Sequence, residues 1–491
     1  GAFRRTESVF LSRIQAGLKT TCPVAQGDKP LEIITTRQWY IRNGGRDEAL
    51  RKDLIKRGHE LAWHPEHMHV RYDNWVRGLN GDWLVSRQRY FGVPVPVWYR
   101  LDSEGAPDYA QPLAPDESLL PIDPQSDVPP GYDEDQRNQP SGFMGDPDIM
   151  DTWATSSLTP QIATGWEDDP DLFVRTFPMD MRPQAHEIIR TWLFSTVVRS
   201  HFEHGCVPWD NVVLSGWILY PDRKKMSKSK GNVITPMGLL ESYGSDGVRY
   251  WAASGRLGTD TAFEEKQMKI GRRLAVKMMN ASKFALGFGG DPNGVITEPL
   301  DTAMLAKLAA LVDEATSSLE KFDYTRALER TEGFFWWFCD DYLELVKGRA
   351  YGEGDGASSA RNALCIGLST IQRLFAPFLP FVTEEIWSWW MQGSVHKSQW
   401  PSAATLTAHT GKSNPLVTSM ASDVMSHIRR AKSDAKVSMK TEVKSVTVTD
   451  KAERLDALLL VQPDLCQAGH INELTTRPGD VFSVDIVLAE A

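Results

Sequence analysis

The segment KMSKSKGNVITP, residues 225–236, follows the β-branched run NVVLSGWIL at residues 211–219 and decides how this chain is interpreted. Lys225 and Lys228 lie three positions apart in a loop rich in Ser, and Pro236 is placed to open a helix that extends to about Tyr243. Lysine supplies a compact, mobile charge that can follow phosphate charge, and serine hydroxyls and loop amides can donate hydrogen bonds to it. A basic loop alone is more often a solvated surface, but the strand before it and the helix after it favour polyphosphate binding.

The length, composition and net charge of the chain exclude several classes of protein. The chain has 491 residues, of which 41% are apolar and 24% charged. These values predict about three globular domains and exclude disordered, collagen-like and disulfide-stapled chains. No apolar run is long enough for a transmembrane helix. No apolar run follows the first five residues either, so a secretory signal is not expected. The net charge of −10 excludes a uniformly basic nucleic-acid binder but allows a local basic face.

The cysteines and tryptophans add two expectations. None of the five cysteines lies within four residues of another, so no metal-ligand spacing is present, and reduced thiols in a cytoplasmic protein are expected. The 17 tryptophans include the pairs Trp336–Trp337 and Trp389–Trp390. Such pairs suit packed helices or a substrate pocket.

Hydrophobic periodicity predicts an α/β region, then an α-helical bundle, then a small α+β module. Residues 1–28 match no pattern beyond a short helix at 9–18, and residues 100–145 are typical of a surface excursion. The run 93–99 alternates like an edge strand. We expect domains at 29–263, 264–401 and 402–491, with a linker at 402–415. The bundle helices are expected at 268–286, 302–322, 324–347 and 358–375, and the module is expected to contain helices at 419–436 and up to 460 and strands at 443–448 and 481–488.

The KMSKS pentapeptide resembles the loop shared by class I aminoacyl-tRNA synthetases, and the resemblance extends from about residue 29 to the C-terminus. DTW at 151–153 and SRQRYFGVP at 86–94 resemble signatures of the valyl and isoleucyl group, and we identify the valyl branch as the nearest match. YGSDGVR at 243–249 resembles the helix after the loop, whereas NASKF at 280–284 and PFLPFVTEEIW at 377–387 resemble the anticodon-binding bundle.

This resemblance implies a partial class I nucleotide-binding fold, ATP-dependent formation of an aminoacyl-adenylate and transfer of the amino acid to tRNA. It implies ATP and Mg²⁺ as cofactors, a valine-like amino acid as substrate, and catalytic roles for Lys225 and Lys228 on the transferred phosphates. Trp153 would wall an amino-acid pocket and Asp151 would orient it, although a core tryptophan and a helix cap are the alternatives. The implied ATP-binding residues are His186, Glu187, Trp217, Met226, Ser227 and Ser229.

The first bundle helix carries four cations that could contact tRNA phosphates or the anticodon arm: Arg272, Arg273, Lys277 and Lys283. A solvated helix face is the alternative for each of them. The aromatic run Phe334–Phe338 is expected to form bundle core rather than a base-stacking platform.

The chain departs from the family pattern in three ways. It contains no His-x-Gly-His motif, and the histidine-rich segment 64–69 is interpreted as a surface turn. No segment of this sequence resembles the editing domain that the family carries as an insertion. Ala185-His186-Glu187 stands where the family has Gly-x-Asp, so a methyl group would crowd the nucleoside at residue 185.

Three explanations follow: a fragment of a full synthetase, one half of a split enzyme, or a truncated paralogue that binds tRNA or serves a biosynthetic pathway. The changes at Ala185 and Glu187 favour the paralogue, and a structural scaffold is a further alternative. Whether the chain alone is an enzyme stays open at this stage. A partial parallel sheet also has an open edge, so we expect residues 1–28, self-association or a protein partner to cover it. No membrane association is expected.

Overall fold

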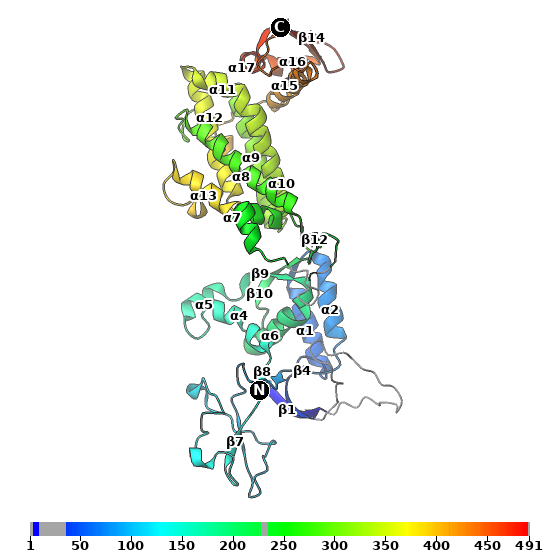
Figure 1. The fold of residues 1–491 in the computed structure, drawn as a ribbon, viewed down its shortest axis with the longest axis vertical. Helices are drawn as coiled ribbons and strands as arrows, with labels where there is room; N and C mark the ends of the chain where they lie inside the picture. Colours follow the sequence, from blue (N-terminus) through cyan, green and yellow to red (C-terminus); the bar gives the residue numbers. More distant parts are fainter. Residues whose placement is uncertain (1–2, 9–35, 225, 227–233, 412, 490–491) are drawn as a thin grey trace, which may run out of the picture. The chain divides into compact units, whose positions relative to one another are not determined.

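The computed structural model describes residues 3–8, 36–224, 226, 234–411 and 413–489 (Figure 1). The chain divides into two compact units, residues 1–216 and 217–491, and each is described separately. The helix from residue 9 to 18 that the sequence suggested lies outside the described residues.

The first unit is built on a parallel sheet with strand order β3–β10–β9. Its strands are β3 (Ala62–His64), β10 (Trp209–Ser215) and β9 (Met179–Ala185). The helices α1 (Glu48–Glu60), α2 (His69–Arg77) and α6 (Phe194–His204) contribute to the core of this unit, where Tyr72 donates a 2.8 Å hydrogen bond to the carbonyl of Leu54. The segment 64–69 is therefore more than a surface turn: His64 ends β3, and Met68 in the 3-10 turn η1 (Glu66–Met68) is buried.

Three small antiparallel sheets complete this unit. One has the order β1 (Phe3–Ser8), β2 (Thr36–Ile41) and β4 (Trp83–Leu84), and the others pair β5 (Ser86–Arg87) with β8 (Ile149–Met150) and β6 (Trp98–Arg100) with β7 (Phe143–Gly145). Of the expected strand at 93–99, only the last two residues belong to a strand, β6. Pro94 makes a single isolated bridge to Ile149. Between β6 and β7 the chain forms turns with two 3-10 helices, η2 (Glu117–Leu119) and η3 (Glu134–Gln136). The short helices α3 (Thr152–Ser156), α4 (Thr159–Ala163) and α5 (Pro170–Thr176) follow β8.

The second unit begins with β11 (Ile218–Leu219), which pairs with β12 (Thr261–Ala262), and α7 (Met237–Ala253). The predicted continuous strand 211–219 is thus interrupted between β10 and β11. Helix α7 bends at Gly244, whose φ of 75° is strained for any side-chain-bearing residue.

The predicted helical bundle is confirmed. The expected single helix at 324–347 contains a π-helical turn, η7, between α10 and α11, and buried Phe338 and Tyr342 lie in this turn. The bundle elements are α8 (Glu265–Leu286), α9 (Pro299–Glu320), α10 (Tyr324–Trp337), η7 (Phe338–Tyr342), α11 (Leu343–Tyr351), α12 (Asp355–Phe375), α13 (Pro380–Ser388) and η8 (Val395–Lys397).

Helix α15 (Leu416–Asp434) of the C-terminal module contributes buried side chains to the same apolar cluster as the bundle. Figure 1 shows the module at the C-terminal end of the bundle. The expected linker 402–415 contains a short helix, α14 (Ala403–Thr407). The module comprises α15 (Leu416–Asp434), β13 (Val443–Asp450), α16 (Ala452–Leu459), α17 (Gln462–Gly469), β14 (Ile471–Pro478) and β15 (Ser483–Leu488), with sheet order β14–β13–β15. Helix α17 and strand β14 were not predicted.

The described cysteines Cys206, Cys339, Cys365 and Cys466 are free thiols, and Cys339 and Cys365 are buried. The aromatic run Phe334–Phe338 spans the end of α10 and the start of η7, and its side chains differ in burial. Phe334, Phe335 and Phe338 are buried in the bundle core, whereas Trp336 and Trp337 are half-buried. Among the helices that the structure describes, none has the length and apolarity needed to cross a membrane.

Candidate functional site

A cavity of about 690 Å³ lies in the first unit and brings together both residues expected to form the amino-acid pocket, Asp151 and Trp153. Further aromatic side chains on its lining are Tyr40, Trp75, Trp83 and Phe194. The cavity therefore combines a largely apolar wall with a few charged groups, which is the usual composition of a small-molecule site.

Asp151 has two bonding partners at the N-terminus of helix α3. Its Oδ1 accepts a 2.7 Å hydrogen bond from the backbone N–H of Trp153, and its Oδ2 forms an ion pair with Arg87. The carboxylate is buried, whereas the Arg87 side chain is 35% exposed. The helix-cap alternative for Asp151 is therefore correct as far as its local contact goes, and the same contact fixes the position of half-buried Trp153.

Several residues on the cavity lining were not among the predicted site residues. Arg190 lies on the π-helical segment η5 (Ile189–Leu193) with its guanidinium carbon 5.7 Å from the centre of the Trp75 ring. Asn43 is buried, and its backbone N–H lies 3.5 Å from Asp82 Oδ1. Arg46 also reaches the cavity. Asn43, Arg46 and Asp82 lie in short polar loops without a motif of their own, whereas Arg87 lies inside the SRQRYFGVP motif.

His186 and Glu187 follow the carboxyl end of β9, the edge of a parallel sheet where ligands usually bind. His186 is buried, and its Nδ1 lies 3.2 Å from the carbonyl oxygen of Ser215 at the end of β10. This contact requires a proton on Nδ1, because a carbonyl oxygen only accepts. Glu187 is exposed.

The predicted phosphate-binding loop is described only in part. Lys225, Ser227, Lys228 and Ser229 lie outside the described residues. Met226 is half-buried and packs against the apolar cluster of Trp251, Phe263 and Met268. The backbone N–H of half-buried Trp217, which precedes the loop, donates a 2.9 Å hydrogen bond to Asp260 Oδ1.

The four predicted RNA-binding cations lie on α8 in different surroundings. Arg272 donates a 2.5 Å hydrogen bond to the carbonyl of Ser242 on α7. Arg273 and Lys277 lie 5.9 and 5.8 Å from the centre of the Trp336 ring, and Lys283 lies 5.5 Å from the Trp389 ring. Arg273 and Lys277 therefore share the Trp336 ring as a neighbour, whereas Arg272 and Lys283 have other neighbours.

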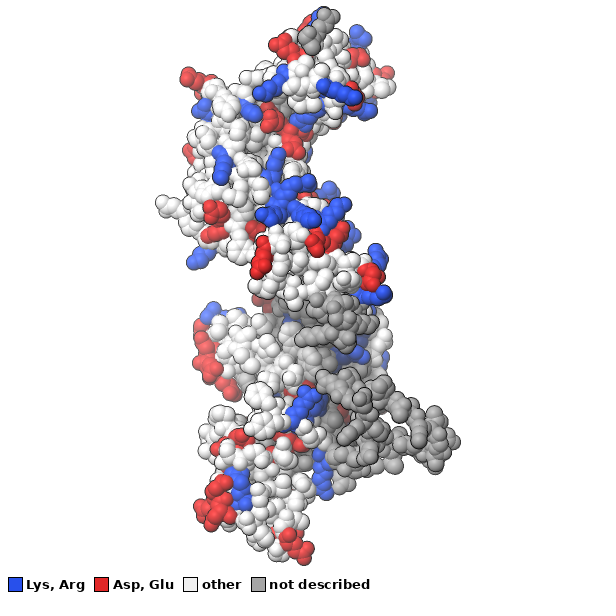
Figure 2. All heavy atoms as spheres, viewed as in Figure 1, with Lys and Arg blue, Asp and Glu red and all other residues white. Residues whose placement is uncertain are grey.

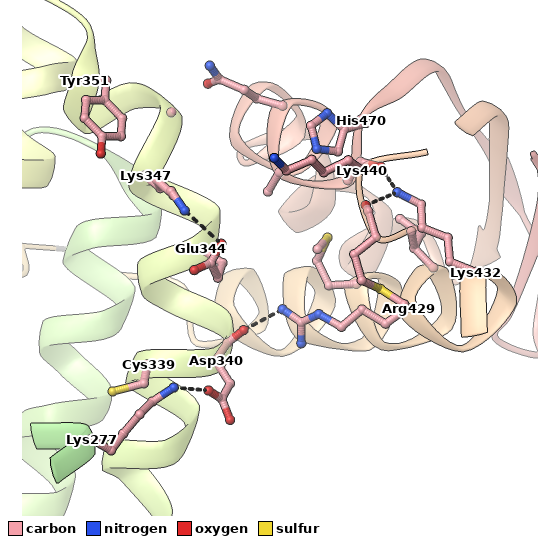
Figure 3. Close-up of a pocket in the computed structure, with 17 residues that line it drawn as sticks. Lys277, Cys339, Asp340, Glu344, Lys347, Tyr351, Arg429, Lys432, Lys440 and His470 are labelled. Atoms are coloured by element: carbon pink, nitrogen blue, oxygen red, sulfur yellow. Dashed lines mark hydrogen bonds and ion pairs between the residues drawn. The ribbon is translucent and has the colours of Figure 1, made fainter. Parts of the chain in front are cut away.

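Arg273 and Lys277 line a hollow of about 520 Å³ with Val276, Asn280 and Trp336. Lys277 also lines a larger groove of about 920 Å³ between the bundle and the C-terminal module (Figure 3). Figure 2 shows Lys and Arg side chains gathered over the bundle. The acidic chain therefore has the local basic surface that its net charge allowed.

Two families match the chain in sequence. Residues 23–264 match the tRNA synthetases class I (I, L, M and V), and residues 301–448 match the anticodon-binding domain of tRNA ligases. The chain is 62% identical over 483 residues to the valine–tRNA ligase of Thermobifida fusca, covering 96% of this chain and 55% of that protein. It is 60% identical to the valine–tRNA ligase of Salinispora tropica, covering 93% and 55%. The chain thus spans about half the length of the curated relatives that it matches.

Solved structures show the same fold at low sequence identity. A methionyl-tRNA synthetase of Mycobacterium tuberculosis in complex with methionyl-adenylate superposes with a TM-score of 0.54 at 18% identity, covering 78% of this chain and 70% of that one. A LeuRS–tRNA–LeuAMS ternary complex from Agrobacterium radiobacter gives a TM-score of 0.52 at 17% identity, covering 84% and 51%.

Proposed function

Because the chain belongs to the class I tRNA synthetases (I, L, M and V), we propose that it takes part in the ATP-dependent activation of valine and its transfer to tRNA. The observation that carries this proposal is the cavity in which Trp153, Asp151 and Arg87 meet. The proposal covers the chain together with the segment or partner that supplies the family's His-x-Gly-His motif, which this sequence does not contain. Such a pocket separates valine from isoleucine by size but discriminates weakly against threonine.

Trp153 forms the wall against the branched side chain of the amino acid in this proposal. The ion pair between Asp151 and Arg87 supports Trp153 by fixing the start of α3. Arg190 lies on the same cavity and carries a positive charge that can face the carboxylate of an amino acid.

Lys225 and Lys228 act on the phosphates of ATP, and Ser227 and Ser229 donate hydrogen bonds from the same loop. Met226 of the same loop packs against the cluster of Trp251 and Phe263. His186, Glu187 and Trp217 are the further ATP-binding residues that the resemblance implies. Mg²⁺ accompanies ATP in this proposal, as the resemblance to the family implies.

The bundle binds tRNA in this proposal, through Arg273 and Lys277 above all. These two cations flank the half-exposed ring of Trp336 and lie next to the groove that holds further cations. Phosphate contacts from Lys and Arg supply affinity, and an aromatic face can accept an unpaired base. Arg272 and Lys283 are proposed to contact tRNA phosphates away from the Trp336 ring.

Valine-dependent exchange of pyrophosphate into ATP by the purified chain tests the activation step. Exchange above background that is lost in Lys228→Ala and lowered in Trp153→Ala supports the proposal. A chain that binds tRNA but shows no exchange, with or without added partner, supports the alternative of a paralogue that binds RNA without activating valine. Ala185 and Glu187 favour that alternative, because they replace the glycine and aspartate of the family pattern. A chain that binds neither ATP nor tRNA contradicts both.

A second polypeptide strand is also proposed beside β9. Among the described residues β9 pairs only with β10, and the described part of the N-terminal segment, β1, pairs with β2 in a different sheet. An uncovered parallel edge favours association. Native mass spectrometry tests this proposal: a dimer or a heteromeric complex is expected, and a monomer with amide protons of β9 exchanging freely contradicts it.

A further inference from the structure

One guanidinium joins the helical bundle to the C-terminal module. Arg349 on α11 forms two bonds with Asp301 on α9, from Nη1 to Oδ2 at 2.8 Å and from Nη2 to Oδ1 at 3.0 Å. It forms two further bonds of 2.9 Å with Asp464 on α17, from Nε to Oδ1 and from Nη2 to Oδ2. Because α17 belongs to the module, this contact crosses the boundary between the two structural parts.

All five N–H groups of Arg349 are used, since Nη1 also donates a 2.8 Å bond to the carbonyl of Gly356. Asp301 is fully buried, and it also accepts bonds from Tyr342 Oη at 2.8 Å and from Ser359 Oγ at 2.7 Å. The Arg349 side chain is only 15% exposed. A planar, fully bonded and buried guanidinium leaves little freedom in how α17 lies on α11.

This contact lies next to the groove of about 920 Å³ between bundle and module, because residues directly beside it in the chain line that groove. Lys347 and Gly348 line the groove directly before Arg349, and Gln467 lines it one helical turn after Asp464. At Gly348 a Cβ would overlap the side-chain amide of Gln467, so α11 and α17 are in close contact here.

The two walls of the groove carry cations. Lys277 and Lys347 come from the bundle, whereas Arg429, Lys432 and Lys440 come from the module. Lys432 is buried, and its Nζ donates 2.9 Å hydrogen bonds to the carbonyls of Met439 and Gly469. Asp340 and Glu344 lie on the bundle wall, where Lys277 pairs with Asp340 at 3.0 Å and Lys347 with Glu344 at 3.6 Å. Away from Arg349, Arg429 bonds Asp341 at 2.5 Å, and Trp337 Nε1 donates to Ser422 Oγ at 2.8 Å. The groove is therefore held at two places.

We propose that Arg349 is a positioning residue for tRNA binding: by joining Asp301 to Asp464 it sets how far the basic wall of the module lies from the lysines of the bundle wall. This inference rests on the proposed function, because it takes the RNA backbone as the occupant of the groove. Phosphates of one strand have a fixed spacing, so cations on opposite walls bind them together only when the walls are held at the matching distance. Arg349 does not contact the RNA.

The groove contains its own reporter of opening. Cys339 lines the groove and is 5% exposed, whereas Cys365 is 2% exposed inside the bundle and does not line it. Burial raises the pKa of the Cys339 thiol to about 12 and that of Cys365 to about 11, so both react slowly while buried. Alkylation of the two thiols by iodoacetamide, resolved by peptide mass spectrometry, separates local opening of the groove from global unfolding.

The test compares Asp464→Ala, which removes the bond across the boundary, with Tyr342→Phe, which removes a bond to Asp301 inside the bundle. In Asp464→Ala we expect Cys339 to be alkylated at least about fivefold faster with Cys365 unchanged, and binding of an RNA hairpin with a valine-tRNA anticodon loop to weaken by a similar factor. Tyr342→Phe is expected to leave the ratio of the two alkylation rates and the hairpin affinity as in the wild type.

Unchanged Cys339 protection and hairpin affinity in Asp464→Ala would overturn the proposal. So would equal acceleration of both cysteines in Asp464→Ala and in the milder Arg349→Lys, because Arg349 would then serve general stability. If the wild-type chain does not bind the hairpin, the proposed tRNA function fails. The alkylation ratio still decides whether Arg349 holds the groove.

Discussion

Arg87 and Asp151 form an ion pair that joins the end of β5 to the turn after β8, and the same carboxylate caps helix α3. Because both bonds end on one side chain, the direction of α3 and the position of Trp153 depend on a single residue. The position of Trp153 in the cavity wall thus depends on Asp151 and Arg87, which lie outside helix α3.

Two substitutions of Asp151 distinguish the contribution of its helix-cap hydrogen bond from that of its ion pair with Arg87. Asp151→Ala is expected to lower the free energy of unfolding by about 1 kcal/mol more than Asp151→Asn, because Asn keeps an oxygen that can accept from the Trp153 N–H. Urea unfolding followed by tryptophan fluorescence measures the difference. Equal losses in the two variants would mean that the ion pair, and not the cap, holds α3.

The carboxylate of Asp246 on α7 predicts a pH dependence. It accepts bonds from the backbone N–H groups of Phe381 at 3.2 Å and Val382 at 2.8 Å, and burial raises its pKa. Between the unfolded value of about 4 and the raised folded value the native state binds more protons, so its stability falls as pH rises through that window. The stability of the wild type relative to Asp246→Asn should therefore decrease from acidic to neutral pH. Parallel stability curves for the two proteins would contradict this.

His204 predicts the opposite slope. Its ring centre lies 4.6 Å from that of Phe177 and 5.5 Å from that of Phe173, and burial lowers its pKa. The neutral form is favoured in the fold, so this contribution is present above the unfolded pKa of about 6.5 and is lost as pH falls through the folded value. His204→Phe should lose less stability than the wild type when thermal unfolding at mildly acidic pH is compared with neutral pH. An identical loss in both would assign the effect to other groups.

Arg273 and Lys277 predict the salt dependence of RNA binding. If each contacts one phosphate, Arg273→Ala and Lys277→Ala should each reduce the slope of log affinity against log salt by roughly one. Lys52→Ala is the matched control, because Lys52 is exposed and pairs with Glu48 on a helix of the first unit. Fluorescence titrations of tRNA at several salt concentrations measure the slopes. The same slope in all four proteins would place the RNA elsewhere.

Local patterns in the sequence predicted the bundle because its helices are long and strongly periodic. Their bounds differ from the expected ones by a few residues, as at α9, where Pro299 begins the helix three residues before the predicted start. The π-helical turn at Phe338–Tyr342 was missed because its apolar residues continue the helical spacing. Helix α17 and strand β14 were missed for a different reason. Helix α17 has only eight residues, and β14 leaves most of its side chains exposed, so neither has a clear apolar pattern.

The candidate site was predictable where a motif names the residue, as for Asp151 and Trp153. Asn43 and Asp82 could not be found in this way, because they reach the cavity only through the folding of separate loops. The groove depends on contacts between residues far apart in the chain, such as Arg349 with Asp464. No periodicity or spacing in one segment carries that information.

Gly348 has a consequence for the history of this fold. Because a side chain at 348 would occupy the space of the Gln467 amide, a larger residue on α11 is tolerated only when α17 offers a smaller one. The two positions are therefore expected to co-vary among related sequences, so that divergence at one is accompanied by compensation at the other.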